Sequence, residues 1–292
     1  MTPSRPAHQP STFSIVARDP HTGDLGVAVQ SKFLAVGSIV PWARAGVGAI
    51  ATQAALNAAF GAAGMRLLAD GWSASEALNH MVSMDDEASQ RQLLIVDAAG
   101  RADAFTGERC YEWAGHCVGD GYACAGNILV SRDTVEAMAR TFESAPGELG
   151  GRLVAALAAG QAAGGDRRGQ QAAALLVVRT AGGYAGRTDR RVDLRVDDHP
   201  QPISELQRLL VLHHLYSQSA PEDLAERSEP ICRELQAILR AAGRLHGEIS
   251  GRFDSATRQA LLDIYNMENL EDRWHEHKID TVALEYLRRK FL

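Results

Sequence analysis

Two short apolar runs separated by a turn open the patterned part of the chain. The first covers Thr12–Arg18, the second covers Leu25–Val29, and Asp19–Gly23 between them contains proline and glycine. Short apolar runs on either side of such a turn are typical of a β-hairpin. The pattern therefore predicts a hairpin whose first residue, Thr12, carries a hydroxyl group.

The remaining apolar runs alternate groups of strands with pairs of helices. Further strands are predicted at Ala49–Gln53, Gln92–Asp97, Ala102–Thr106, Tyr111–Val118, Tyr122–Val130, Ala172–Arg179 and Val192–Val196. Helices are predicted at Ala54–Ala69, after the capping box of Ser73 and Glu76, and at Arg132–Ser144, Leu149–Ala163 and Ile203–Tyr216. This is not the strict βαβ alternation of a parallel sheet. The order instead predicts an α+β fold in which sheet packs on sheet and helices lie outside.

The composition changes on both sides of this domain, which is expected to cover residues 12–216. Residues 1–11 contain three prolines and no apolar core, which predicts a disordered tail. Residues 217–230 are polar and acidic with two prolines, and they are predicted to form a linker. Residues 231–292 are predicted to be a small all-α domain, near the lower size limit for independent folding. Its helices are expected at Ile231–Ala242, Ser255–Ile264 and Asp280–Phe291.

Composition and charge exclude several classes of protein. The chain has 292 residues, of which 46% are hydrophobic and 23% charged, and its net charge is −6. These values are ordinary for a globular protein, and the acidic balance argues against a nucleic-acid surface. No apolar run approaches the roughly 20 residues that span a bilayer, and the first residues do not resemble a signal peptide. We therefore expect a cytoplasmic protein with neither nucleic acid nor membrane as a partner.

The cysteines and histidines do not indicate a metal site, and no cofactor is expected. Cys110, Cys117 and Cys124 are seven residues apart, which is not a zinc-binding spacing. Free cysteine is among the most buried residue types, so we interpret these as small buried thiols in strands. A metalloenzyme would have to use the histidines of polar segments, namely His213, His214, His275 and His277. Histidines in such segments are usually solvated, which makes this alternative the weaker one.

Several motifs occur in the same order as in one bacterial protein family. They are Thr12–Ala17, Pro41–Ala49, Thr52–Ala54, Ala114–His116, Gly126-Asn127 and Ala163–Gly169. On these motifs the region from Thr12 to Leu215 resembles the domain-of-unknown-function 1028 family, which is placed among the N-terminal-nucleophile (Ntn) hydrolases. The tail is similar to a peptidoglycan-binding-like module often appended to that family. The motifs of the tail are Leu245–Glu248, Asp254–Thr257 and Asn269–Glu271.

The resemblance implies a fold and a chemistry. The fold would be the four-layer αββα sandwich of Ntn hydrolases. These enzymes attack an amide with a terminal Thr, Ser or Cys, whose own α-amine can act as the base. By this resemblance Thr12 is the nucleophile, and Arg44 and Asp166 complete the catalytic set. The residues implied in oxyanion or substrate binding are Thr52, Gln53, Asn127, Lys32 and Arg167.

The sequence departs from the pattern of proteasome-type enzymes in three ways. Arg44 stands where those enzymes place a lysine, and because arginine cannot shuttle protons, Lys32 is the alternative cation. The aspartate expected on the second strand is not found in Val27–Ser31. Eleven residues precede Thr12, so a free α-amine on this residue requires the removal of Met1–Ser11.

Two hypotheses about function follow. In the first, the protein is an Ntn-type amide hydrolase that acts on a small N-acyl or ureido compound or on a short peptide. In the second, it is a non-catalytic Ntn-fold protein that binds a ligand or assembles, with the C-terminal helices as an assembly element. Asn127 would then be only a turn residue that follows a glycine. We expect a small-molecule partner and a homo-oligomer, a dimer or larger.

Overall fold

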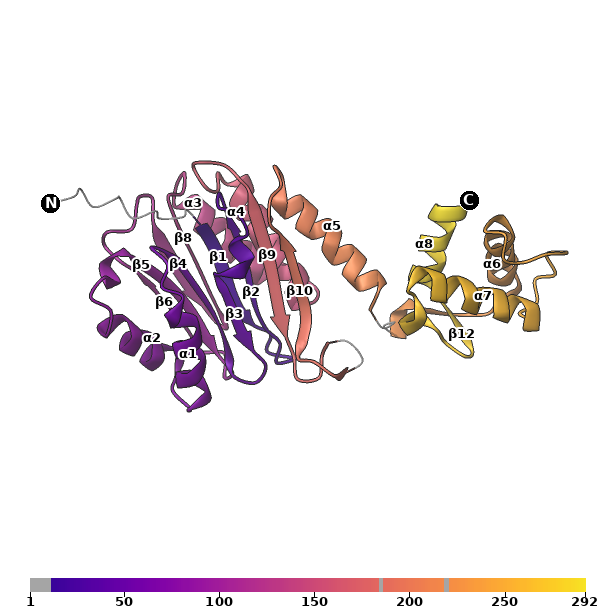
Figure 1. Cartoon of the computed structure of the whole chain (residues 1–292), viewed down its shortest axis with the longest axis horizontal. Helices are drawn as coiled ribbons and strands as arrows, with labels where there is room; N and C mark the ends of the chain where they lie inside the picture. The colour runs from indigo at the N-terminus through magenta and orange to yellow at the C-terminus, as the bar shows by residue number, and fades with distance from the viewer. Residues whose placement is uncertain (1–11, 184–185, 218–220) are drawn as a thin grey trace. The chain divides into compact units, whose positions relative to one another are not determined.

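The chain divides into two units, which are described one at a time. The computed structural model describes residues 12–183, 186–217 and 221–292. The units are Met1–Leu210 and Val211–Leu292 (Figure 1). The tail predicted at residues 1–11 lies outside the described residues.

The predicted hairpin lies at the centre of a six-stranded antiparallel sheet. In spatial order the strands are β10 (Arg190–Val196), β9 (Ala172–Val178), β2 (Leu25–Ser31), β1 (Thr12–Arg18), β8 (Tyr122–Asn127) and β7 (Gly115–Gly119). The hairpin is confirmed, since β1 pairs with β2 from Thr12 opposite Ser31 to Arg18 opposite Leu25. Every residue of β2 is buried, which explains its almost continuous apolar sequence.

A second antiparallel sheet of four strands is built from a continuous stretch of the chain. Its order is β3 (Pro41–Arg44), β4 (Gly48–Ala54), β5 (Arg91–Asp97) and β6 (Ala102–Thr106). The sequence did not predict β3. This strand has a proline at its first position, no apolar alternation, and only half-buried or exposed residues, all of which suit an edge strand.

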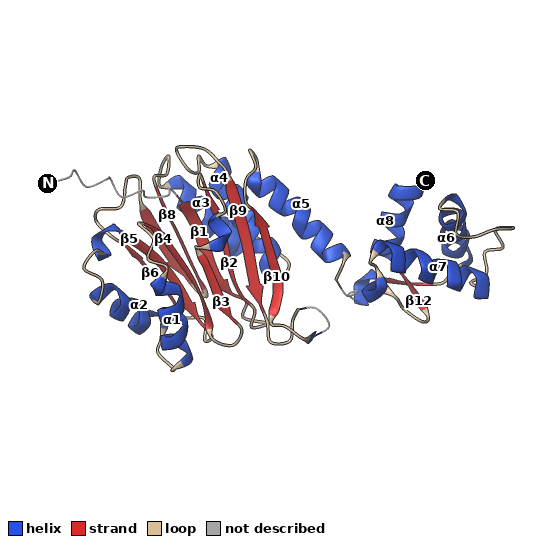
Figure 2. Ribbon diagram, viewed as in Figure 1, coloured by secondary structure: helices blue, strands red, loops and turns tan. Residues whose placement is uncertain are grey.

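The two sheets pack face to face through an apolar interior (Figure 2). Val16 and Val27 of the central hairpin meet Ala51 of β4 and Leu94 of β5 in one buried cluster. The outer helices are α1 (Ala59–Ala69), α2 (Ala74–Ser83), α3 (Asp133–Ser144) and α4 (Leu149–Ala162). The first two pack on the four-stranded sheet and the last two on the six-stranded sheet. The predicted α+β fold is therefore confirmed, with layers in the order helix, sheet, sheet, helix.

Several element boundaries differ from the prediction, such as the end of β8 at Asn127 and the end of the helix from Ser255, which lies at Glu268. Two further differences have local reasons. The helix expected from Ala54 begins at Ala59 instead. Ala54 has a φ of 65°, a left-handed conformation that cannot continue into an α-helix, and the Asn57 side chain accepts a hydrogen bond from the Ala59 backbone N–H at 3.1 Å. The strand expected from Tyr111 begins only at Gly115, where pairing with β8 starts.

The predicted capping box is confirmed. Ser73 Oγ accepts the backbone N–H of Glu76 at 3.3 Å, and the Glu76 carboxylate accepts the backbone N–H of Ser73 at 2.8 Å. These reciprocal bonds satisfy two backbone donors that the first turn of α2 would otherwise leave without partners. Helix α2 therefore begins where the sequence places it.

The C-terminal unit is a small helical domain. After α5 (Pro202–Leu215), its helices are α6 (Glu229–Ala241), α7 (Ser255–Glu268) and α8 (Thr281–Phe291). Leu235, Ile238, Leu261, Ile264 and Leu287 form the centre of its core. All three predicted helices therefore contribute side chains to one core.

The all-α prediction for this unit requires one correction. Strands β11 (Leu224–Glu226) and β12 (Lys278–Asp280) form a short antiparallel pair, and β11 lies inside the segment 217–230 that was expected to be a linker. Strands of three residues are too short to give a periodic pattern, so the sequence did not predict them. Within the described residues, no helix has the length and apolar character needed to cross a bilayer.

Candidate functional site

Thr12 occupies the first position of β1, on the face of the six-stranded sheet that meets the other sheet. Successive residues of a strand point to opposite faces, and Thr12 shares its face with Val16 of the interior cluster. Because β1 lies between β2 and β8, Thr12 is opposite Ser31 on one side and Asn127 on the other. The Thr12 hydroxyl donates a hydrogen bond to Ser31 Oγ at 3.2 Å, and the side chain is fully buried. The hydroxyl therefore has a polar neighbour at one end of the interior between the two sheets.

A buried network of carboxamides lies beside Thr12. Ser14, the next residue on the same face of β1, donates to Gln53 Oε1 at 2.6 Å. Gln53 Nε2 donates to Gln92 Oε1 at 2.8 Å, and Asn127 Nδ2 donates to the same oxygen at 3.0 Å. All of these side chains are fully buried. The network joins strands of both sheets and includes two of the predicted site residues, Gln53 and Asn127.

Gln92 is the centre of this network, and the sequence did not predict its role. Its Nε2 has three acceptors in reach, Thr106 Oγ1 at 2.9 Å and the carbonyl oxygens of Gly126 at 2.9 Å and Gly115 at 3.2 Å. Thr106 Oγ1 lies 2.9 Å from His116 Nδ1, so the network extends to the edge strand β7. Burial lowers the pKa of His116, which favours the neutral ring. The sequence feature that could have indicated this role is a glutamine near the start of a continuous apolar strand.

Asp166 lies in a loop held against the start of the site. Its Oδ2 accepts the backbone N–H of Lys32 at 2.9 Å, and its Oδ1 accepts the backbone N–H of Arg168 at 2.8 Å. Arg168 also forms an ion pair with the Asp166 carboxylate at 3.4 Å. Lys32 follows Ser31, the acceptor for the Thr12 hydroxyl. The buried carboxylate therefore fixes the backbone beside the hydroxyl pair.

Lys32 and Arg167 also belong to this end of the sheet. The Lys32 side chain is exposed, and its Nζ donates to the carbonyl oxygen of Gln170 at 3.2 Å. The Arg167 backbone N–H donates to Ile128 O at 3.0 Å, and its guanidinium donates to Leu129 O at 3.3 Å. These carbonyls belong to the two residues that follow Asn127 in the sequence. The predicted residues Thr12, Lys32, Asn127, Asp166 and Arg167 therefore come together at one end of the domain.

Arg44 and Thr52 are placed elsewhere. Arg44 is exposed at the turn between β3 and β4, opposite Gly48. Gly48 and Gln53 are five residues apart on β4, which is about 16 Å along a strand. Thr52 points to the opposite face from Gln53, where its Oγ1 donates to Asn57 O at 3.3 Å, and its backbone N–H donates to Val40 O at 3.3 Å. Neither residue joins the cluster around Thr12.

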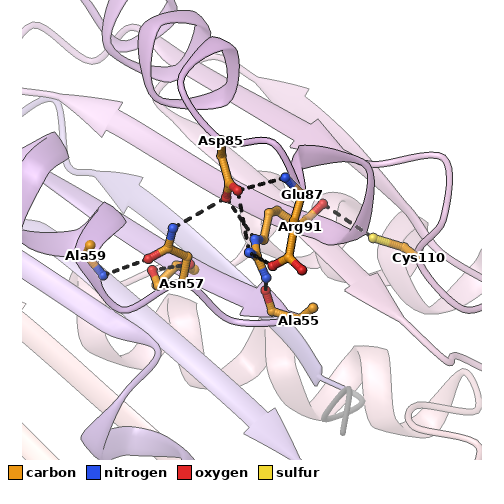
Figure 3. A network of polar contacts seen from close by, with 8 residues as sticks. Ala55, Asn57, Ala59, Asp85, Glu87, Arg91 and Cys110 are labelled. Carbon is orange, nitrogen blue, oxygen red and sulfur yellow. Dashed lines mark hydrogen bonds and ion pairs between the residues drawn. The ribbon is translucent and has the colours of Figure 1, made fainter. Parts of the chain in front are cut away.

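The loop that follows Gln53 is closed by an arginine that the sequence did not predict to matter (Figure 3). Arg91, at the start of β5, donates to Asp85 Oδ2 at 2.8 Å, to Glu87 at 2.5 Å and to the carbonyl oxygen of Ala55 at 2.5 Å. Hydrogen bonding by Arg91 holds the pKa of Asp85 below its ordinary value. Asn57 Nδ2 donates to the same carboxylate at 3.3 Å. The loop between β4 and α1 is therefore tied to the segment before β5.

The site offers buried hydroxyl groups and carboxamides and a buried carboxylate. Nucleophilic attack by a hydroxyl and stabilisation of an oxyanion by amide donors are the reactions that these groups support. In the described parts of the chain, no group of three or more His, Cys, Asp or Glu side chains could hold a metal ion.

Comparisons with known proteins agree with the division of the chain. The model of the "Family of unknown function (DUF1028)" matches residues 12–206, and that of a "Putative peptidoglycan binding domain" matches residues 215–287. A crystal structure of a DUF1028 protein from Silicibacter pomeroyi is 34% identical, covers 68% of this chain and 88% of its own, and superimposes with a TM-score of 0.63. A search of curated proteins found no match. Because the family model covers well over half of its length, the chain belongs to the DUF1028 family.

Proposed function

We propose that the domain at residues 12–206 is an N-terminal-nucleophile amide hydrolase with Thr12 as its nucleophile. The observation that supports this is the place of the Thr12 hydroxyl, 3.2 Å from Ser31 Oγ and next to the loop of Asp166. The order of layers, helix, sheet, sheet, helix, is the one that this enzyme class uses, although a fold alone does not assign an activity. The substrate class is a small N-acyl or ureido compound or a short peptide.

The reaction needs a base beside the hydroxyl, and removal of Met1–Ser11 would supply one. The Thr12 nitrogen then becomes an α-amine with a reference pKa of about 7.7–8.0, which suits proton transfer near neutral pH. The Thr12 oxygen attacks the substrate carbonyl while the α-amine takes the hydroxyl proton. The leaving amine receives that proton, an ester to Thr12 remains, and water hydrolyses the ester.

Three neighbouring residues have supporting roles in this proposal. The Asn127 carboxamide lies opposite Thr12 in the register and serves as a donor for the oxyanion. The Asp166 carboxylate fixes the backbone of Lys32, and the exposed Lys32 ammonium supplies positive charge for an anionic part of the substrate. Arg44 has no role, because it lies at the far end of β4.

The first experiment follows the intact mass of the purified full chain over time. The wild-type chain should lose the mass of Met1–Ser11, and Thr12→Ala should keep it. Thr180→Ala, which changes an exposed threonine in a turn of the same domain, is the matched control and should behave as wild type.

A chain produced with Thr12 as its first residue tests the chemistry separately from processing. Against a panel of N-acyl amines, ureido compounds and dipeptides, it should hydrolyse at least one compound about 100-fold faster than the Thr12→Ala form. If the full-length mass persists and the chain that starts at Thr12 is no faster than its alanine form, the proposal fails.

A non-catalytic binding protein is the second candidate, and one set of observations favours it. In the continuous chain the Thr12 side chain is 0% exposed, and its nitrogen is a peptide nitrogen. The carboxamides of Gln53 and Asn127 are already bonded to Gln92. This candidate predicts an intact N-terminus and binding of compounds from the same panel without turnover, which calorimetry and product analysis distinguish.

The C-terminal unit carries a proposal of its own, that it assembles the chain into a homo-oligomer. Large apolar side chains on this unit are exposed, among them Val211, Met267 and Leu292. Light scattering on the full chain should give a dimer or larger species, and a Met267→Asp variant should shift it toward the monomer. A monomeric wild type that co-sediments with insoluble peptidoglycan would instead favour the ligand named in the family description.

A further inference from the structure

Two cysteines lie directly opposite each other at the edge of the six-stranded sheet. Cys117 of β7 pairs with Cys124 of β8 in the antiparallel register, so both side chains are on the same face. The Cα atoms of directly opposite residues are about 4.5 or 5.5 Å apart, depending on the type of pair. A disulfide needs about 4.4–6.8 Å between Cα atoms. The register therefore places the two Cα atoms within the range that a disulfide requires.

The two thiols differ in access. Cys124 is fully buried under α3, and its Sγ lies 3.6 Å from the carbonyl oxygen of Val135. Cys117 is half-buried and lines a cavity of about 330 Å³. The side chains of Trp113, Arg132 and Glu136 are among the others that line this cavity. Cys117 therefore borders this cavity, whereas Cys124 does not.

The environment favours the thiolate at the accessible position. A hydrogen bond from the Cys124 thiol lowers the pKa of Cys117 from its ordinary value of 9.0 to about 6, against the opposing effects of burial and of the carboxylates of Glu143 and Glu136. The same bond raises the pKa of Cys124. By contrast, burial raises the pKa of Cys110 to about 11. The thiolate is the nucleophilic form of cysteine. Cys117 is therefore the more reactive cysteine of the pair, and Cys124 remains a protonated thiol.

We propose that Cys117 and Cys124 form a thiol–disulfide exchange site that accepts a small-molecule disulfide in the cavity beside α3. The Cys117 thiolate attacks one sulfur of the ligand, the ligand S–S bond breaks, and the first thiolate leaves. Cys124 gives its proton to that thiolate and attacks Cys117 Sγ, which forms the Cys117–Cys124 bond and releases the second thiolate. This thiolate takes up the proton that Cys117 had lost. The ligand is reduced to two thiols and the protein dithiol is oxidised.

The experiment uses the full chain, reduced and then freed of reductant, with oxidised glutathione as the probe. The intact mass should fall by two hydrogen atoms, with no glutathione retained. Cleavage at aspartate and glutamate separates the cysteines, because Asp120 lies between Cys117 and Cys124 and Glu112 lies between Cys110 and Cys117. The oxidised protein should then give one pair of peptides joined between Cys117 and Cys124. This result does not depend on any variant folding.

Single substitutions distinguish the two roles. In the Cys124→Ser variant the reaction should stop at the mixed disulfide, which keeps one glutathione bound to Cys117. In the Cys117→Ser variant no glutathione should be bound to Cys124. Cys110→Ser removes another buried thiol of the same domain and should react as wild type. The proposal is overturned if the wild-type chain keeps its reduced mass, or if Cys110 or Cys232 is modified as readily as Cys117.

Discussion

Each unit of the chain contains an arginine that binds both carboxylates and backbone carbonyl oxygen, half-buried Arg91 in one unit and buried Arg273 in the other. The Arg91 side chain is 11% exposed and binds Asp85, Glu87 and the carbonyl oxygen of Ala55. The Arg273 side chain is 4% exposed and lies 2.9 Å from Asp280. It also donates to the carbonyl oxygens of Leu215 and His214, at the end of α5. Both arginines therefore donate to backbone carbonyl oxygens as well as to carboxylates.

The difference lies in what surrounds each arginine. The Asp280 carboxylate is 0% exposed and also accepts the backbone N–H of Ala283 at 2.7 Å, which caps α8. All partners of Arg273 are therefore structural. Arg91 instead holds the loop that follows Gln53, and Gln53 belongs to the network beside Thr12. Similar chemistry stabilises a fold in one unit and positions a candidate site in the other.

The largest effect is expected for Arg273→Met, which would leave the Asp280 carboxylate buried without its cation. Breaking a buried ion pair by removing one partner costs about 3–5 kcal/mol, so the unfolding free energy of the C-terminal unit should fall by that amount. Chemical denaturation, with hydrogen exchange to assign the loss to residues 211–292, measures it. Arg258→Met removes an exposed ion pair and should cost less than about 1 kcal/mol. Equal losses for the two variants would contradict a structural role for Arg273.

A smaller loss of stability, together with a local effect on the site, is expected for Arg91→Met. Hydrogen bonds to charged groups contribute about 1.5–3 kcal/mol, and the exposed Glu87 carboxylate can be hydrated by water once Arg91 is removed, so we expect a total loss of about 2–3 kcal/mol. Hydrogen exchange should become faster in residues 54–58, next to Gln53. Arg101→Met, which changes a more exposed ion pair of the same sheet, is the control. An unchanged rate in residues 54–58 would show that Arg91 does not hold this loop.

The smallest effect, with a distinct pH dependence, is expected for Asp85→Asn. The pKa of Asp85 is lowered in the folded protein, first of all by hydrogen bonding with Arg91. A lowered pKa stabilises the fold above the ordinary value of 3.8, and this contribution is lost as the pH falls through the folded value. The variant should lose about 1–2 kcal/mol at pH 7, and the difference from wild type should shrink at acid pH. Denaturation series from pH 7 downward test this, and a constant difference would contradict it.

Periodicity predicted the buried strands well and the marginal ones poorly. The strands β1, β2 and β5 are apolar because both of their faces are covered, and their runs are visible in the sequence. The edge strand β3 buries little and contains Pro41, so nothing in its pattern distinguishes it from a turn. Pairing with β4, a tertiary contact, makes it a strand.

The alternation of side chains along a strand explains why one of two neighbouring predicted site residues belongs to the site and the other does not. Thr52 and Gln53 are neighbours in β4, so only one of them can face the interior between the sheets, and the structure gives that place to Gln53. Which of the two faces inward depends on the packing of the sheets and is not fixed by a motif. The distance of Arg44 from Thr12 likewise depends on the direction in which β4 runs beside β1. The sequence contains no measure of that direction.

The pairing of Cys117 with Cys124 could have been predicted from the sequence. Gly119-Asp120-Gly121 separates the strands predicted at Tyr111–Val118 and Tyr122–Val130, and residues at equal distances from such a short turn face each other. Counting outward from Asp120 and Gly121 brings Cys117 opposite Cys124, as the structure confirms. The spacing of seven excludes a zinc site but fits a cross-strand pair.

The chain order of the two sheets has a consequence for folding. The four-stranded sheet uses only residues 41–106, whereas the six-stranded sheet joins residues 12–31 to residues 115–196. During synthesis the first hairpin must therefore wait until most of the domain has left the ribosome before β8 and β9 can flank it. Closing so long a loop is slow because its entropy must be lost before the distant contacts form. The four-stranded sheet can form first, and the six-stranded sheet can then form by packing against its apolar face.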